Sequence, residues 1–242
     1  STRVIREDIQ NENLLFVGTE FSIFASVNRG QDWTEIKNNM PTGAVHDILV
    51  HPTEGELIAG THGRGIWISD VSALRQMTAE VLAAGTYLFK PHRATLWGYS
   101  PPEGGTNYGH EQLTTDPAPM GAQIYYSLPA EAQQLSLKIL SLDRQVVAEI
   151  PQPANKAGLN RAEWNLRQSP PPGAASQQQA AAAGRGGQRG EIPAAGGQFG
   201  GRGGRGGPGG GIAVQPGRYI ISLTVNGREL TQTLEVRPDP GI

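Results

Sequence analysis

The sequence predicts an all-β protein in two parts. About two four-stranded sheets, which are blades of an incomplete β-propeller, precede an immunoglobulin-like or fibronectin-like β-sandwich that carries a long Gly/Arg-rich insert. Three observations predict this class. A segment near the N-terminus recurs after 42 to 43 residues, short runs of β-branched and aromatic residues are bounded by turn residues, and 16 of the 33 glycines fall between Gly173 and Gly211.

The repeat defines the first part, over residues 1–71. Leu15-Phe-Val-Gly-Thr-Glu20 matches Leu57-Ile-Ala-Gly-Thr-His62, and Ile23-Phe-Ala-Ser26 matches Ile66-Trp-Ile-Ser69 after a one-residue insertion. Four short strands in forty-odd residues is the period of a propeller blade. The expected strands are 3–6, 14–19, 23–27 and 33–36 in the first copy, and 45–50, 56–60 and 65–69 in the second.

One turn of the first copy, Ser26-Val-Asn-Arg-Gly-Gln-Asp-Trp33, carries a motif. It resembles the Asp-box, Ser-x-Asp-x-Gly-x-Thr-Trp, of bacterial-neuraminidase-type (BNR) repeats, with Asn28 in place of the Asp and Asp32 in place of the Thr. We expect Ser26 and Asn28 to fasten the turn, Gly30 to take a positive φ, and Trp33 to plug the sheet. The motif predicts a structural role and no catalytic one.

A connector is predicted over 72–121. It begins with a helix from Ser72, as N-cap, to Ala84, with Gly85 as the stop. From Tyr87 to Ala122 the sequence is rich in turn residues and reads as an irregular, aromatic-bearing segment.

The sandwich is predicted over 122–242, with strands at 123–128, 135–140, 145–150, 161–166, 218–225 and 229–236. Asn226-Gly227 is the signal of a two-residue hairpin, and Trp164 is the expected large core side chain. Modules of this kind commonly bind partners or serve as spacers, and they rarely catalyse reactions.

The insert over 168–215 has too little apolar surface to offset the entropy of ordering, so disorder in isolation is the default. Its arginines are separated by glycines, and one aromatic residue lies among them. The candidate partner-binding residues are Arg185, Arg189, Arg202, Arg205 and Phe199. One stacking ring and a small net charge argue against nucleic acid as the partner. An arm that becomes ordered on a partner's surface and an insertion without a role both remain open.

Several segments resemble one family. Val45-His-Asp-Ile-Leu-Val-His-Pro52 and Gly60-Thr-His-Gly-Arg-Gly-Ile-Trp-Ile-Ser-Asp70 look like the closing blades of large secreted bacterial proteins with sortilin-type propellers, which are often labelled glycosyl hydrolases. Ala157-Gly-Leu-Asn-Arg-Ala-Glu-Trp-Asn-Leu-Arg167 is similar to the C-terminal Ig-like domain of that family. The resemblance implies an extracytoplasmic location, periplasmic or secreted. Because the chain starts at Ser1 and not at Met, we also expect N-terminal processing.

Catalysis is not expected. A glycosidase needs two carboxylates across the scissile bond, and propeller sites lie where many blades converge, whereas two blades are present here. The carboxylates considered are Glu20, Asp32, Glu35, Asp47 and Asp70. The chain has no cysteine, and His46 and His51 fall on opposite faces of one strand, so we expect neither a metal nor a cofactor. His62 and Arg64 form a weak candidate anion site in the Gly60–Gly65 turn, for which a structural role is favoured.

Together these features predict a non-enzymatic, extracytoplasmic structural or interaction protein. We expect an accessory subunit that docks on and stabilises a larger protein assembly, such as the outer face of a membrane complex, because an unclosed pair of blades leaves apolar faces and sheet edges to be covered. No apolar run is long enough to span a membrane. The alternative is the C-terminal part of a secreted propeller glycoside hydrolase or of a glycan- or peptide-binding protein.

Overall fold

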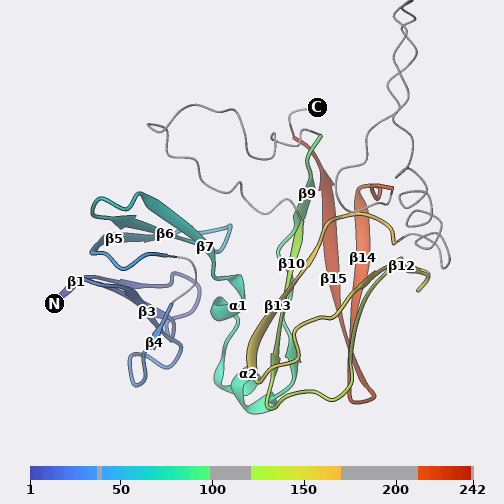
Figure 1. The fold of residues 1–242 in the computed structure, drawn as a ribbon, viewed down its shortest axis with the longest axis horizontal. Coiled ribbons are helices and arrows are strands. Elements are labelled where there is room, and N and C mark those ends of the chain that lie inside the picture. Colours follow the sequence, from blue (N-terminus) through green and yellow to red (C-terminus); the bar gives the residue numbers. More distant parts are fainter. Residues whose placement is uncertain (37–39, 99–120, 170–211, 241–242) are drawn as a thin grey trace, which may run out of the picture.

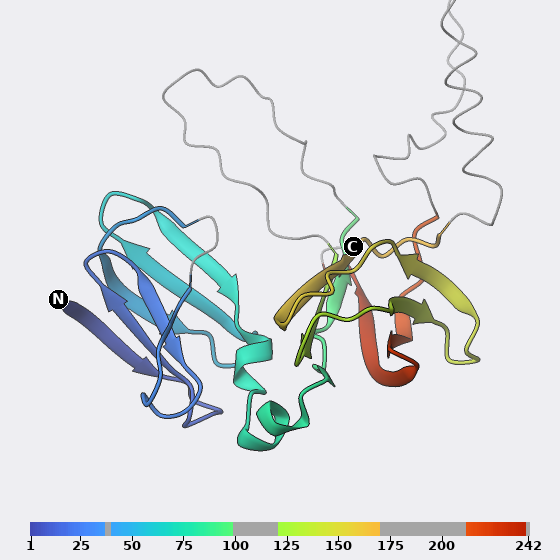
Figure 2. The ribbon, with the colours of Figure 1, turned by 60° about the horizontal axis from the view of Figure 1, so that its bottom comes forward.

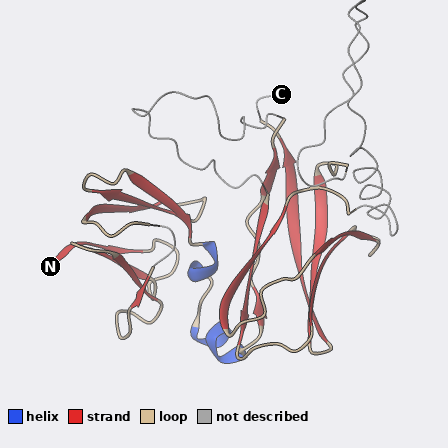
Figure 3. Cartoon of the chain, viewed as in Figure 1, coloured by secondary structure: helices blue, strands red, loops and turns tan. Residues whose placement is uncertain are grey.

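The computed structural model describes residues 1–36, 40–98, 121–169 and 212–240, and in these the chain is almost entirely β (Figures 1 and 3). Sheets of four and three strands form the N-terminal half, and layers of three and five strands form the C-terminal half (Figure 2). The all-β class is confirmed.

The first sheet contains the four strands of the first repeat in the order of the chain. These strands are β1 (Thr2–Glu7), β2 (Leu15–Thr19), β3 (Ile23–Ser26) and β4 (Thr34–Glu35). Each neighbouring pair is antiparallel. Their bounds lie within a residue or two of those expected from the alternation of apolar and polar residues.

The second sheet contains three described strands, β5 (Val45–Val50), β6 (Glu56–Thr61) and β7 (Ile66–Asp70). The chain leaves the sheet after β7, where the backbone N–H of Val71 donates to Gly55 O (2.8 Å) and that of Ser72 donates to Asp70 Oδ1 (2.8 Å). The outer edge of β7 therefore has no strand beside it among the described residues, where the first sheet has β4.

The two sheets are copies of one unit. The register of the first shifts between Thr2 and Val4, and that of the second shifts between Val45 and Asp47, at positions 43 residues apart. The sheets pack face to face through one cluster of buried side chains. It comprises Val4, Leu14, Phe16, Ile23 and Ala25 from the first repeat and Val45, Ile48, Val50, Leu57 and Ala59 from the second.

The expected helix over 72–84 is instead two short helices, α1 (Ser72–Arg75) and α2 (Ala79–Ala84). Thr78 interrupts the helix because its backbone is extended and its hydroxyl accepts from the N–H of Val81 (3.4 Å), which caps α2. Ser72 is not the N-cap, since α1 is preceded by Val71, which makes no side-chain cap. Gly85 ends α2 with a φ of +71°, as expected.

The segment expected to be irregular after α2 contains two short strands, which corrects that expectation. β8 (Tyr87–Leu88) pairs with β10, and β9 (Ala94–Leu96) runs parallel to the end of β15. Their partners lie far along the chain, so no local pattern marks them. Residues 99–120, which include Tyr99 and Tyr108, lie outside the described residues.

The C-terminal half is a two-layer sandwich. One layer has the order β13-β10-β8 and the other has the order β12-β11-β14-β15-β9. The remaining strands are β10 (Ala122–Leu128), β11 (Leu135–Leu140), β12 (Val146–Ile150), β13 (Gly158–Trp164), β14 (Gly217–Val225) and β15 (Arg228–Pro238). β13 begins three residues before the expected 161. Asn226 and Gly227 both have positive φ (47° and 87°), as the predicted hairpin turn requires.

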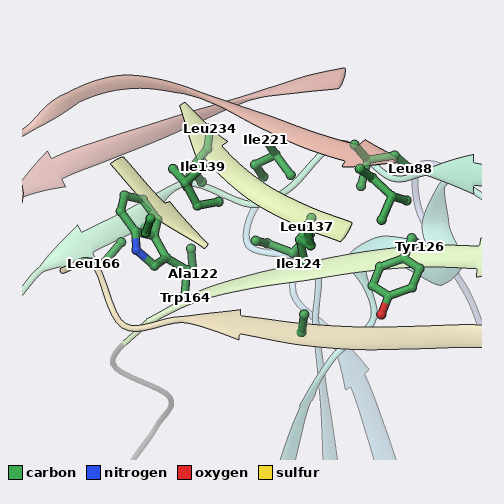
Figure 4. Close-up of a cluster of buried hydrophobic side chains, with 14 of the residues drawn as sticks. Leu88, Ala122, Ile124, Tyr126, Leu137, Ile139, Trp164, Leu166, Ile221 and Leu234 are labelled. Atoms are coloured by element: carbon green, nitrogen blue, oxygen red, sulfur yellow. The ribbon is translucent and has the colours of Figure 1, made fainter. Parts of the chain in front are cut away.

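The sandwich core lies between these layers (Figure 4). Trp164 is 1% exposed, as expected for the main core side chain, and its indole N–H donates to Arg167 O at 2.9 Å. Its ring meets that of Tyr219 edge to face, with centroids 5.4 Å apart. The large core side chains drawn include Tyr126 and Ile124 of one layer and Leu137, Ile139, Ile221 and Leu234 of the other.

Candidate interaction surfaces

The side of the second sheet that points away from the first carries exposed apolar residues. Register places Leu49, Ile58 and Ile68 side by side across β5, β6 and β7, with Ile66 two positions before Ile68. Leu49, Ile66 and Ile68 are 58%, 73% and 63% exposed, and Ile58 is half-buried. We call these four residues the second outer face.

The first sheet has a corresponding surface on its own far side. Ile5, Val17 and Phe24 are paired across β1, β2 and β3, and we call them the first outer face. Ile5 is 56% exposed, and the other two are half-buried. Figure 1 shows the two sheets stacked and the sandwich beside them, over neither outer face. Clustered exposed apolar side chains mark surfaces that associate.

The sequence predicts docking at the blades but does not by itself single out these residues. The signal was present, because the repeat aligns Ile58 and Ile66 with Phe16 and Ile23. The latter two are buried between the sheets, at 0% and 2% exposure. Side chains that are core in one copy are thus surface in the other.

The Asp-box-like turn lies between β3 and β4 and is closed by its own side chains. Ser26 Oγ donates to Asn28 Oδ1 (2.9 Å) and accepts from the N–H of Gly30 (2.8 Å), and Asn28 Oδ1 accepts from the N–H of Asp32 (2.9 Å). Gly30 has a φ of +84°. Ser26, Asn28 and Gly30 therefore make the fastening contacts expected of them.

Trp33 contributes to this turn differently from the expectation. Its indole N–H donates to Gly30 O (3.1 Å), and a Cβ added at Gly30 would lie 3.4 Å from its ring. The side chain is 39% exposed, so it covers the turn from outside rather than plugging the sheet.

The turn from β6 to β7 contains the candidate anion residues. Thr61 N–H donates to Gly65 O (3.2 Å), and Gly63 and Gly65 have φ of +68° and +78°. His62 donates its backbone N–H to Ala44 O (2.9 Å), and its ring stacks on that of His46 with centroids 5.2 Å apart. The carbonyl of Arg64 accepts from the indole of Trp67 (2.9 Å). The backbone N–H of His62 is thus used by the fold, which favours the structural role of this turn.

The Gly/Arg-rich insert is pinned where it leaves and re-enters the sandwich. Gln168 N–H donates to Ile212 O (2.9 Å), Val214 N–H donates to Leu166 O (3.0 Å), and Arg167 bridges Ala213. The candidate residues Arg185, Arg189, Phe199, Arg202 and Arg205 themselves lie outside the described residues.

A hollow of about 1090 Å³ opens beside this ladder, between the edges of β12 and β13. Glu149, Glu163 and Arg167 are its charged lining residues, and Ile150 and Pro151 are among the apolar ones. None of the five carboxylates considered for catalysis lines it.

Those five carboxylates are distributed over the blades, where they take part in contacts of the fold. Arg3 pairs with Glu20 (3.0 Å) and Arg6 pairs with Asp47 (2.8 Å). Asp32 Oδ2 accepts from Asn28 Nδ2 (2.8 Å), and Asp70 Oδ1 accepts from the N–H of Ser72. Glu35 lies in β4. These contacts hold strands and turns, and they do not direct two carboxylates at a shared cavity.

The two halves of the chain meet around β7 and β10. Burial, together with the nearby carboxylate of Asp70, raises the pKa of Tyr125 to about 12. Glu54 of the second sheet pairs with Arg93 and lies 3.6 Å from His92, both in the connector. The blades are thereby fixed to the sandwich by polar contacts.

Within residues 1–36, 40–98, 121–169 and 212–240, no group of three or more His, Cys, Asp or Glu side chains is placed to hold a metal ion. No helix there has the length and apolarity to cross a membrane.

No protein-family model matches the chain, and no curated protein matches it. Among solved structures, it is similar to the extracellular domain of a hybrid two-component system protein from B. thetaiotaomicron, with a TM-score of 0.24 and 11% identity. The alignment covers 100% of this chain and 26% of that protein, so the chain spans about a quarter of its length. The function of this chain is therefore argued from its own geometry.

Proposed function

We propose that this chain is a non-enzymatic, extracytoplasmic interaction protein that docks through its blades on a larger assembly and stabilises it. The observation that carries the proposal is the exposure of Ile66 (73%) and Ile68 (63%) on a sheet whose inner face packs against the first sheet. Covering such side chains contributes about 1.5–3 kcal/mol each. The sortilin-type and BNR resemblance of the sequence supports the extracytoplasmic location.

The outer edge of β7 adds to this docking capacity. Edge strands present unpaired N–H and C=O groups to any strand that approaches, and β7 carries Ile66 and Ile68 at the same edge. A β-rich partner can therefore bury side chains and pair backbone at one place. The Gly/Arg insert, rooted at the other end of the molecule, is proposed as a second arm for acidic groups.

One observation favours the alternative, a glycan- or peptide-binding or hydrolase fragment. The hollow between β12 and β13 is large, and Glu149 and Glu163 line it from opposite strands. Carboxylates on two sides of a cleft suit hydroxyl or cationic ligands. Loss of ligand binding in Glu163→Gln, with the fold unchanged, would favour this second function.

The test of the main proposal is the native mass of the protein extracted gently from its source. Migration in a large complex at fixed stoichiometry, shifted by Ile68→Lys but not by Leu142→Lys, is the expected result. Leu142 is a matched control because it is 65% exposed on the turn after β11, far from the blades. Migration of the protein alone would contradict the docking role.

A further inference from the structure

The first sheet contacts the second through a face that corresponds, in the repeat, to the outer face of the second sheet. This relation specifies what fits on the two outer faces. The repeat aligns Phe16, Ile23 and Ala25 of the first sheet with Ile58, Ile66 and Ile68 of the second. The first three face the second sheet and are 0%, 2% and 7% exposed. The outer face of the second sheet therefore repeats the surface with which the first sheet binds its neighbour.

The first outer face corresponds, in turn, to the inner face of the second sheet. Ile48, Ala59 and Trp67 of the second sheet are paired across its strands and face the first sheet. Their equivalents in the first sheet are the first outer face, Ile5, Val17 and Phe24. The two described sheets thus present two different outer faces, and each corresponds by the repeat to one of the two faces that meet between the sheets.

A pair of glycines supports the same conclusion independently. A Cβ on Gly18 would lie 2.9 Å from Val45 Cγ1, because the first strand of the next sheet crosses there, and 2.7 Å from Val4 Cγ1. At the equivalent Gly60, the nearest atom is Asp47 O at 3.8 Å. The second sheet thus has room beside Gly60 for a strand that crosses it, and no strand of the described chain lies there.

We propose that the occupant is a second copy of this chain, bound head to tail, with the first outer face of one copy seated on the second outer face of another. The inference rests on the proposed function, since it takes the blade faces as docking surfaces and names what covers one of them. A contact between two different surfaces repeats by rotation and closes into a ring when the rotation allows. Propellers close at about four to eight blades, so about two to four copies would complete one.

The first experiment measures the mass of the purified full chain by light scattering over a wide concentration range. We expect a particle of two to four copies of the 25.7 kDa chain. A 25.7 kDa monomer at every concentration would overturn the inference.

Paired variants test the head-to-tail geometry. Ile68→Lys blocks the second outer face and Ile5→Lys blocks the first, because each places an unpaired ammonium in an apolar contact. Each variant alone should be monomeric, whereas an equimolar mixture should form a heterodimer, since each variant retains the face that the other lacks. Both positions are exposed, so circular dichroism should show an intact fold, and Leu142→Lys should keep the wild-type mass.

The outcomes separate this inference from the proposed function. Disruption by Ile68→Lys with no effect of Ile5→Lys would indicate a symmetric contact and refute the head-to-tail arrangement. A purified monomer that still migrates in a large complex from its source would refute self-assembly and leave the docking function standing. A monomer that also migrates alone from its source would refute both.

Discussion

The guanidinium of Arg75 contacts both carboxylate oxygens of Asp8, 67 positions earlier in the chain, through Nε (2.8 Å to Oδ2 and 3.1 Å to Oδ1) and Nη2 (2.7 Å to Oδ2). The two side chains are 9% and 0% exposed. Nη2 also donates to His51 O (3.1 Å), at the end of β5. One side chain of α1 thereby joins both sheets to the connector.

Arg75→Met should destabilise the blades strongly, because it keeps the aliphatic stem and leaves the carboxylate of Asp8 buried without its counter-charge. Breaking a buried pair in this way costs about 3–5 kcal/mol. Urea unfolding would measure the change. The matched control is Glu12→Gln, which removes an exposed pair with Arg29 (66% and 61% exposed) and should cost less than about 1 kcal/mol. Equal costs for the two variants would contradict the assignment.

Gly18→Ala and Gly60→Ala should have different effects, although the two glycines are repeat equivalents. The first inserts a methyl group into the contact between the sheets and should lower the free energy of unfolding by about 1–3 kcal/mol. The second makes only an ordinary van der Waals contact, with Asp47 O at 3.8 Å, and should leave thermal unfolding of the monomer unchanged while weakening self-association. A loss of fold in Gly60→Ala would show that its surroundings are tighter than described.

Asn28 and Asp32 should be coupled, because both depart from the Asp-box pattern and they bond to each other. Asn28 Nδ2 donates to Asp32 Oδ2 at 2.8 Å. Asn28→Asp removes this donor and brings two carboxylates together, whereas adding Asp32→Thr restores a hydroxyl donor. We expect the double variant to recover most of the stability lost in Asn28→Asp. A double-mutant cycle measures this coupling at about 0.5–3 kcal/mol, and additive effects would count against it.

Stability should fall in strong alkali because of two tyrosines of β10, Tyr126, which is buried, and Tyr125, which is half-buried. Burial raises the pKa of Tyr125 and of Tyr126 to about 12 from an ordinary value near 10. Below about pH 10 both phenols are protonated in the folded and unfolded states. As the pH rises from about 10 to 12, the unfolded chain ionises first, so the folded state loses relative stability. Unfolding free energies at about pH 9 and pH 11 test this, and Tyr126→Phe should flatten the decline.

The Tyr126→Phe variant has a second consequence that serves as its control. The hydroxyl of Tyr126 donates to the carbonyl of Ala154, an exposed residue, so its removal loses this hydrogen bond at every pH. We expect a pH-independent loss of about 0.5–1.5 kcal/mol besides the flatter slope. Ultraviolet titration in which all tyrosines ionise near pH 10 would contradict the burial effect.

The strands were predictable and the contacts between them were not. Alternation and repeats fixed β1 to β7 and most of the sandwich within about two residues, because a half-buried strand displays its period locally. β8 and β9 were missed since each pairs with a strand remote in sequence, such as Pro238 opposite Leu96. The helix was overextended because Thr78, read as a helical residue, caps a new helix instead.

The contacts of the candidate site likewise include some that the sequence predicts and some that it does not. The turn contacts of Ser26, Asn28 and Gly30 followed from a local motif, whose spacing predicts its own hydrogen bonds. The pair of Asp8 and Arg75 could not be predicted, because no pattern links positions 67 apart. The outer faces were readable only by combining the repeat with the strand period and noting that the second copy has no successor in the described sheets.

Backbone hydrogen bonds and a β-bridge join Leu166–Gln168 to Ile212–Val214. This ladder makes the geometry of the sandwich independent of the number of residues between the two segments. Because β13 and β14 are positioned by the core and by this ladder, changes in the number of residues between Ser169 and Ile212 need not shift either strand. The segment between Ser169 and Ile212 can therefore be exchanged for another, in evolution or by protein engineering. Replacing residues 170–211 with a short Gly/Ser linker should leave the fold intact, and a foreign tag grafted there should be displayed at the rim of the sandwich.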